Sequence, residues 1–121
     1  MTKLSDANKA LVVRYWSEVL NGQNFDLMKQ LLSPSYQFNG KPSTYKENEA
    51  WVKDMHAKMP GMKFKILEVV GEDVHVAIRW LLDSGTATAI GANFITIEGG
   101  QAISNDQAGG DHFTPKTPAG S

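Results

Sequence analysis

Cysteine is absent from the 121 residues of this sequence, which excludes disulfide bonds, thiolate metal sites and a cysteine nucleophile. The net charge is only -1 and the basic residues are scattered, so we expect binding neither to nucleic acid nor to an anionic membrane. His56, His75 and His112 lack the paired spacing of a metal site. No phosphate-binding glycine loop, nucleophile elbow or Ser-His-Asp arrangement occurs. The sequence therefore predicts no metal and no cofactor.

Long apolar runs are missing as well. Charged residues interrupt the N-terminal amphipathic pattern, so we expect no signal peptide or membrane span and a cytoplasmic protein. Hydrophobic residues make up 41% and charged residues 21%, which is a normal balance for one globular domain of this length. Toward the C-terminus the composition shifts to Gly, Pro, Thr and Lys. We expect a single domain over residues 1–110 and a flexible tail over residues 111–121.

The first half of the sequence carries the spacing of amphipathic helices. Apolar residues recur three and four positions apart, and Gly or Pro follows each segment. We expect three helices, which run from Ser5 or Asp6 to about Leu20, from about Phe25 to Leu32, and from Ser43 or Thr44 to about Lys58.

The second half alternates with the period of strands. After a short strand at Tyr36–Phe38, we expect strands over Met62–Val70 and Val74–Leu82, and a long hairpin over Gly85–Gln107 that turns at Glu98-Gly99-Gly100. Helices first and strands later predict an α+β domain, in which three N-terminal helices cover a curved, mixed or antiparallel sheet. A curled sheet closed by helices leaves a cone-shaped pocket.

Strand alternation also predicts which side chains share a face. On the hairpin, Asn93 lies with apolar residues, while Asn105 and Gln107 share a face and Asp106 points the opposite way. In the strand before it, an apolar row that includes Trp80 alternates with a row that includes Arg79. The pattern alone places the Trp80 row inward.

Several segments together resemble the nuclear transport factor 2-like superfamily, and within it the SnoaL-like polyketide cyclases and ketosteroid isomerase-like proteins. The resemblance spans roughly residues 8 to 108. It is carried by Arg14-Tyr15-Trp16 through Asn21-Gly22, Leu31-Leu32-Ser33-Pro34, Phe38-Asn39-Gly40, Val76-Ala77-Ile78-Arg79-Trp80 followed by Gly85-Thr86, and Ile97-Glu98-Gly99-Gly100 with Ala102-Ile103. It implies the cone-shaped fold, whereas function varies widely on this fold.

Comparison with ketosteroid isomerases implies a site with two carboxylates replaced. Tyr15 matches that family's tyrosine donor, the base position falls on Asn39 or Gly40, and the acid beside the oxyanion falls on Asn93. An amide cannot act as a base near neutral pH, so proton shuttling by that family's route is not expected. Tyr15 and Asn93 could still serve as donors to an oxyanion.

Other branches of the superfamily imply different residues. SnoaL-type cyclases use an acid near the last strand, for which Asp106 and Asp111 are the candidates. Similarity to limonene epoxide hydrolases matches Arg79, which suggests that the Arg79 side of its strand faces the cavity. The expected acidic partners, however, fall on Leu81 and near Gln107.

These comparisons yield one set of candidate residues, for some of which a purely structural role remains the alternative. The candidates are Tyr15, Asn93 and Asp106 for catalysis, and Trp16, Asn39, Met55, Arg79, Ile95, Asn105, Gln107 and His112 for the pocket. Tyr15 could instead be core packing, Asn93 a buried amide bonded to backbone, and Arg79 a salt-bridge partner of Asp83. If both faces of the Trp80 strand are buried, the Trp80 row would pack against a second subunit as a homodimer.

Two functions follow from this set. The first is a cofactor-independent isomerase, cyclase or lyase that acts on a small hydrophobic carbonyl compound by stabilising its enolate. The second is a noncatalytic module that binds a small ligand or a protein partner in the same pocket.

Overall fold

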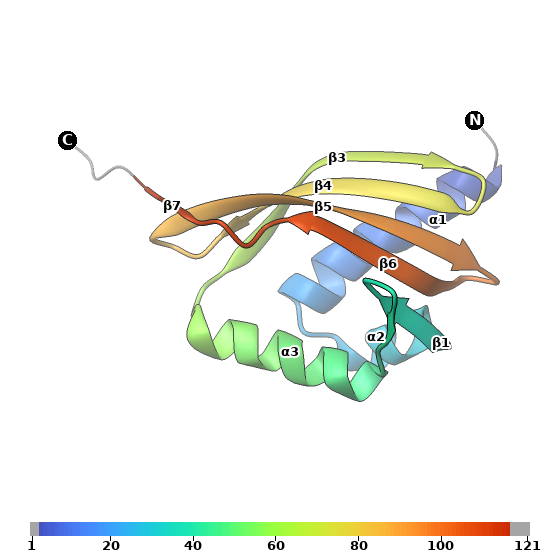
Figure 1. Cartoon of the computed structure of the whole chain (residues 1–121), viewed down its shortest axis with the longest axis horizontal. Helices are drawn as coiled ribbons and strands as arrows, with labels where there is room; N and C mark the ends of the chain where they lie inside the picture. The colour runs from blue at the N-terminus through green and yellow to red at the C-terminus, as the bar shows by residue number, and fades with distance from the viewer. Residues whose placement is uncertain (1–2, 117–121) are drawn as a thin grey trace.

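The structure is a computed structural model that describes residues 3–116. Its elements are α1 (Lys3–Arg14), η1 (Tyr15–Asn21), α2 (Phe25–Leu31), β1 (Leu32–Phe38), β2 (Lys41–Pro42), α3 (Tyr45–Lys58), β3 (Lys63–Glu72), β4 (His75–Asp83), β5 (Ala87–Glu98), β6 (Gln101–Gly109) and β7 (Thr114–Pro115). The expected α+β fold is confirmed: helices lie against one side of a curved, open, mixed sheet of seven strands (Figure 1).

The sheet follows the order β2-β1-β6-β5-β4-β3, and β7 adds to β5. Strands β3 to β6 form an antiparallel meander, whereas β1 pairs with β6 in parallel. The turn between β5 and β6 lies at Gly99 and Gly100, both of which have positive φ, as the Glu-Gly-Gly pattern predicts.

The first helix changes from an α-helix to a π-helix, whereas the spacing of its apolar residues predicts one continuous α-helix. From Tyr15 to Asn21 the segment η1 is a π-helix, a form that is rare and often occurs at functional sites. Tyr15, Trp16, Val19 and Leu20 are all buried. At its end, the Asn21 side chain pairs with the backbone of Phe64 in β3: Nδ2 donates to the carbonyl at 3.0 Å and Oδ1 accepts from the N–H at 2.7 Å.

Helix α3 begins with a capping box, in which the Thr44 hydroxyl accepts from the Glu47 N–H and the Glu47 carboxylate accepts from the Thr44 N–H. Val52 and Met55 bury its inner side. On the same helix, His56 Nε2 lies 2.7 Å from the Leu20 carbonyl, so its N–H donates to the end of η1. This contact joins α3 to η1, and α3 lies on the same side of the sheet as α1 (Figure 1).

Strand β4 resolves the two opposing expectations about its faces. Val76, Ile78, Trp80 and Leu82 are 1 to 4% exposed and belong to the hydrophobic core. Arg79 points outward and pairs with Glu68, with Nε and Oε1 3.6 Å apart. The apolar pattern therefore predicted the inner face correctly, and the placement of Arg79 toward the cavity was wrong. Because Trp80 is buried within one chain, it offers no surface to a second subunit.

The C-terminal segment lies along the sheet edge as far as the structure describes it. Thr114 and Pro115 pair with Thr88 and Ala87, and the Lys116 N–H donates to the Thr86 carbonyl at 2.9 Å. Lys116 Nζ lies 2.8 Å from Asp83 Oδ1. Thr114 and Pro115 of the expected tail are thus paired with β5, and residues 117–121 lie outside the described part of the chain.

Candidate functional site

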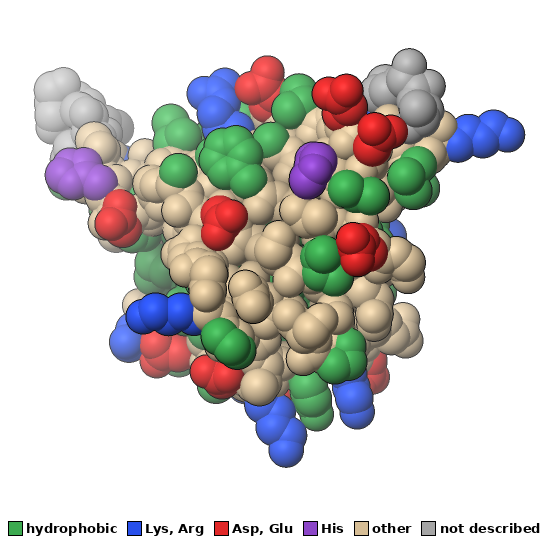
Figure 2. All heavy atoms as spheres, turned by 45° about the vertical axis from the view of Figure 1, so that its right-hand side comes forward, with side chains coloured by type: hydrophobic (Ala, Val, Ile, Leu, Met, Phe, Trp, Pro, Cys, Tyr) green, Lys and Arg blue, Asp and Glu red, His purple; other side chains and the backbone are tan. Residues whose placement is uncertain are grey.

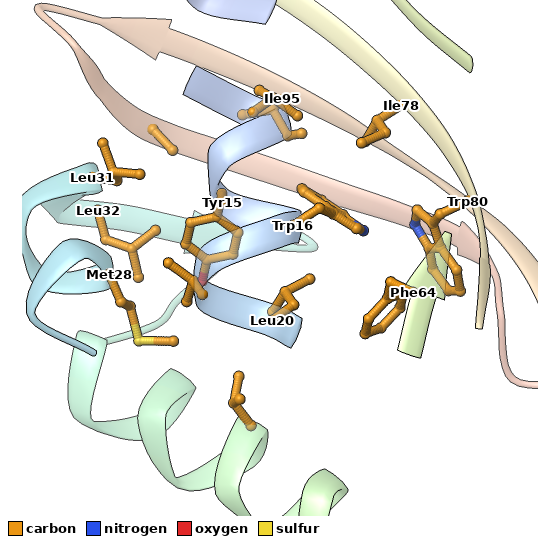
Figure 3. Close-up of a cluster of buried hydrophobic side chains, with 14 of the residues drawn as sticks. Tyr15, Trp16, Leu20, Met28, Leu31, Leu32, Phe64, Ile78, Trp80 and Ile95 are labelled. Atoms are coloured by element: carbon orange, nitrogen blue, oxygen red, sulfur yellow. The ribbon is translucent and has the colours of Figure 1, made fainter. Parts of the chain in front are cut away.

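A cavity of about 430 Å³ lies between η1, α3 and the inner face of the sheet. Its inner wall consists of side chains from η1 and strands β3 to β6, and Figure 3 shows part of this wall, with Tyr15, Trp16 and Leu20 on the helix opposite Phe64 and Trp80. The lining residues are Tyr15, Trp16, Leu20, Phe38, Trp51, Asp54, Met55, Lys58, Met59, Phe64, Trp80, Leu82, Asn93, Asn105, Gln107, Gly110 and Phe113. Most of this surface is apolar or aromatic, as in pockets that bind small organic molecules.

Four buried side chains form a continuous row of hydrogen bonds, here called the polar row. Trp80 Nε1 donates to Asn93 Oδ1 at 2.7 Å, Asn93 Nδ2 donates to Asn105 Oδ1 at 2.8 Å, and Asn105 Nδ2 donates to the Tyr36 hydroxyl at 3.1 Å. Because an indole can only donate, Trp80 fixes which end of each amide is oxygen. Each amide nitrogen carries a second N–H beyond its bond in the row. The row therefore has N–H groups left to donate, beside amide oxygens that already accept one bond each.

Two glycines make room for the Trp80 ring. A methyl group added at Gly91 would lie 2.6 Å from Trp80 Cζ2, and one added at Gly110 would lie 2.2 Å from Trp80 Cη2. On its other side the ring meets Phe64 edge to face, with centroids 5.0 Å apart. The indole is thereby held in the position from which it donates to Asn93.

Tyr15 and Trp16 bring two further polar groups to the cavity wall from η1. Burial, with a smaller contribution from Tyr36, raises the pKa of Tyr15 far above its ordinary value. Its hydroxyl therefore stays protonated at neutral pH and can act as a donor. Trp16 is 3% exposed, and its Nε1 has no hydrogen-bond partner within residues 3–116.

Tyr36 closes the polar row on strand β1. Burial raises its pKa to about 12; the hydrogen bond from Asn105 opposes this shift, and the nearby Asp106 carboxylate adds to it. Sequence reasoning named neither Tyr36 nor Trp80 as part of the site. The signal for Trp80 was its place on the inward row, two residues along β4 from Ile78, which pairs with Asn93. Tyr36, in contrast, meets Asn105 only through the parallel pairing of β1 with β6.

Among the described residues that line the cavity, the charged ones, Asp54 and Lys58, lie at its mouth. Among the described lining residues Asp54 is the one carboxylate, and its Oδ2 lies 3.0 Å from Lys58 Nζ on the same helix. Trp51 and Phe113, 50% and 37% exposed, flank this opening. Charge is therefore found at the mouth, and neutral donors are found inside.

The structure brings six of the candidate residues together at the cavity: Tyr15, Trp16, Met55, Asn93, Asn105 and Gln107. Asn93 and Asn105 are bonded to side chains, so the alternative of an amide bonded to backbone does not hold for Asn93. The Gln107 side chain donates from Nε2 to the Gly109 carbonyl at 3.0 Å.

Five candidates lie elsewhere. Asp106 is exposed and borders a hollow on the outer sheet face, because alternation turns it away from Asn105 and Gln107. Arg79 lies on that outer face too. Asn39 is exposed in the turn after β1, where its Oδ1 accepts from the Gln107 N–H at 2.8 Å. Ile95 faces a separate small pocket of about 20 Å³, and His112 is exposed while its neighbour Phe113 reaches the cavity.

Residues 3–116 contain no group of three or more His, Asp or Glu side chains that is arranged to hold a metal ion. Within the same range, no helix has the length and apolar character needed to cross a membrane.

Comparison with known proteins gives one family match and many similar folds. The SnoaL-like domain family matches residues 12–105. No curated protein matches the sequence. A SnoaL-like polyketide cyclase from Agrobacterium tumefaciens superposes with a TM-score of 0.73 at 17% identity, over 92% of this chain and 94% of that one. A protein from Jannaschia sp. CCS1, provisionally described as a SnoaL-like polyketide cyclase, superposes with a TM-score of 0.77 at 14% identity, over 90% of this chain and 89% of that one. A protein from Kribbella flavida, provisionally described as a ketosteroid isomerase, superposes with a TM-score of 0.74 at 15% identity, over 96% of this chain and 87% of that one. At these identities the superpositions establish the fold.

Proposed function

The chain belongs to the SnoaL-like domain family, and from that premise we propose that its cavity binds a small hydrophobic carbonyl compound and stabilises the enol or enolate form without a cofactor. The observation that carries this proposal is the polar row, of which Trp80, Asn93 and Asn105 line a largely apolar cavity of about 430 Å³. Preorganised donors in a water-poor site stabilise developing negative charge more strongly than water does.

Tyr15 and Asn93 are the donors proposed to meet the substrate oxygen. The Tyr15 hydroxyl stays protonated, and Asn93 has one N–H left after its bond to Asn105. No carboxylate lies at this inner end among the described lining residues. A substrate with an acidic C–H, such as a β-dicarbonyl compound, therefore suits the site, because its proton can leave to water at the open mouth while the oxygen keeps its donors.

A thermal-shift screen tests the binding step. The purified protein is mixed with cyclic enones, phenols and polyketide-like aromatic ketones, and the screen is repeated with Asn93→Leu. A ligand at about one hundred times its dissociation constant stabilises the fold by roughly 2.7 kcal/mol, which is readily detected. Asn8→Leu is the matched control: Asn8 is buried and donates to the Asp73 carbonyl, but it does not line the cavity.

We expect Asn93→Leu to lose the response and Asn8→Leu to keep it, although both are less stable than the wild type. With a ligand in hand, isomerisation and cyclisation are assayed in Tyr15→Phe and Asn93→Leu. Loss of an oxyanion donor should lower the turnover rate about one hundredfold. Unchanged turnover in both variants would refute the role of these donors.

A noncatalytic binding module is the second candidate, and one observation favours it. The sole carboxylate among the described lining residues, Asp54, lies at the mouth and is paired with Lys58. A site without an inner base suits ligand storage or sensing as well as catalysis. A ligand that binds tightly and is recovered chemically unchanged, with no exchange of its acidic protons for deuterium, would decide for the binding module.

We also propose that two copies associate through the outer sheet face in the cytoplasm. Val70, Ile90 and Phe94 are 53 to 55% exposed. In Figure 2, hydrophobic side chains on the face shown are spaced among polar groups and charges of both signs. Light scattering of the wild type and of Phe94→Lys tests the proposal, since a charge on this face should shift the protein to monomer. A wild type that is monomeric at high concentration would refute it.

A further inference from the structure

The indole N–H of Trp16 is a buried donor without a partner. Its side chain is 97% buried, since its exposed fraction is 3%, and Nε1 has no hydrogen-bond partner in residues 3–116. An unpaired buried donor is destabilising, so native proteins rarely keep one without a reason. Trp16 lines the cavity, and Figure 3 shows its nitrogen on the edge of the ring that faces Trp80 and the sheet.

The oxygens of the polar row are each already engaged by a donor of the row. Trp80 donates to Asn93 Oδ1, Asn93 donates to Asn105 Oδ1, and Asn105 donates to the Tyr36 hydroxyl. Each of these oxygens keeps a second lone pair, but none of them is a hydrogen-bond partner of Trp16 Nε1. An acceptor oxygen that a ligand brings into the cavity would pair with this donor.

We propose that the Trp16 indole N–H donates a hydrogen bond to an acceptor oxygen of the bound ligand and thereby selects carbonyl compounds over hydrocarbons of the same shape. The inference rests on the proposed function, because it concerns the same cavity, and adds a specificity-determining residue to it. A ligand without oxygen would leave the donor unpaired, whereas a ketone or quinone oxygen pairs with it. Sites with buried polar groups reject analogues that cannot pair with those groups.

Proton–nitrogen correlation spectra of the labelled protein provide the direct test, because each tryptophan gives its own indole signal. The sequence has three tryptophans, and the other two serve as internal controls: Trp80 already donates to Asn93, and Trp51 is half exposed at the mouth. The probes are α-tetralone and tetralin, which share a fused-ring shape and differ in the ketone oxygen. Trp51→Phe and Trp16→Phe assign the signals.

We expect α-tetralone to move the Trp16 indole proton downfield, in the direction of a new hydrogen bond, and tetralin to leave it without that downfield shift. In calorimetric titrations, Trp16→Phe should weaken α-tetralone binding about three- to tenfold more than it weakens tetralin binding, because one hydrogen bond is lost only with the ketone. Since any change in cavity shape or stability affects both probes, the ratio of affinities isolates the donor.

The outcomes separate the two proposals. If α-tetralone binds in the cavity and the Trp16 signal does not shift downfield, or if Trp16→Phe weakens both probes equally, the Trp16 assignment is overturned while the proposed function stands. If neither these probes nor the enones, phenols and aromatic ketones of the thermal-shift screen bind, both proposals fall. If Trp16→Phe does not fold, Trp51→Phe and Trp80→Phe assign the three indole signals, and the spectra of the wild type still decide the question.

Discussion

Replacement of Gly91 by alanine should damage the site through the Trp80 ring. The added methyl group would lie 2.6 Å from Cζ2 and 2.7 Å from Cη2, about 1 Å closer than carbon atoms normally pack. Because Phe64 blocks the ring on another side, the indole must shift away from Asn93. Overpacking costs about 1 to 3 kcal/mol, and unpairing buried groups of the polar row costs about 1 to 3 kcal/mol more. We expect urea unfolding, followed by circular dichroism, to show a loss of about 2 to 6 kcal/mol.

A double-mutant cycle decides whether Trp80 is the cause. Trp80→Phe removes the two ring atoms that meet the new methyl group, so Gly91→Ala should cost much less in that background. Gly71→Ala on β3 is the matched control, since its methyl group would meet the flexible Lys9 side chain at 2.9 Å. An equal cost of Gly91→Ala in both backgrounds would refute the reasoning, as would a control variant that is equally destabilised.

Three further changes test other parts of the structure. Since the folded-state pKa of Tyr36 is about 12, above its ordinary value near 10, the stabilisation from its neutral form is complete below pH 10 and is lost as pH rises to 12. Between pH 10 and pH 12, the free energy of unfolding of the wild type, measured by urea titration, should fall by about 2 to 3 kcal/mol more than that of Tyr36→Phe. If the two free energies of unfolding change with pH in parallel, the reasoning is contradicted. Thr44→Ala removes the α3 cap and should cost about 1 kcal/mol in thermal unfolding, whereas no change would show that the Glu47 contact suffices. Lys116→Met should speed amide hydrogen exchange at residue 116, because the ion pair with Asp83 holds it beside β5; unchanged exchange would show that backbone pairing alone holds it.

The inner face of the sheet could be predicted from the sequence because burial in a strand follows a period of two. Alternation placed Trp80 inward, put Asn93 with the apolar residues and turned Asp106 away from Asn105, and the structure has these orientations. The expectations that placed Arg79 in the cavity and made Asp106 catalytic were taken from relatives. Solved structures of 14 to 17% identity share the fold, and a shared fold does not fix the role of an individual side chain.

Other features could not be predicted, since they depend on contacts between distant segments. Nothing in the local sequence distinguishes an α-helix from the π-helix at Tyr15–Asn21, which ends where the Asn21 side chain pairs with Phe64. The bond between Tyr36 and Asn105 joins residues 69 positions apart. The tail was expected to be free because Gly and Pro are common there, yet backbone pairing with β5 requires no particular side chains.

The parallel pairing of β1 with β6 has a consequence for how the protein folds. Strands β3 to β6 pair with neighbours along the chain, so they close short loops, whereas β1 must wait for β6, the last strand of the meander. Closing a long loop costs more entropy, so docking of β1 should be the slow step. A shift of β1 by one residue would turn Tyr36 to the opposite face and leave the Asn105 amide without its acceptor. The same amide that helps to form the cavity wall therefore selects the correct register of the last strand pair to form.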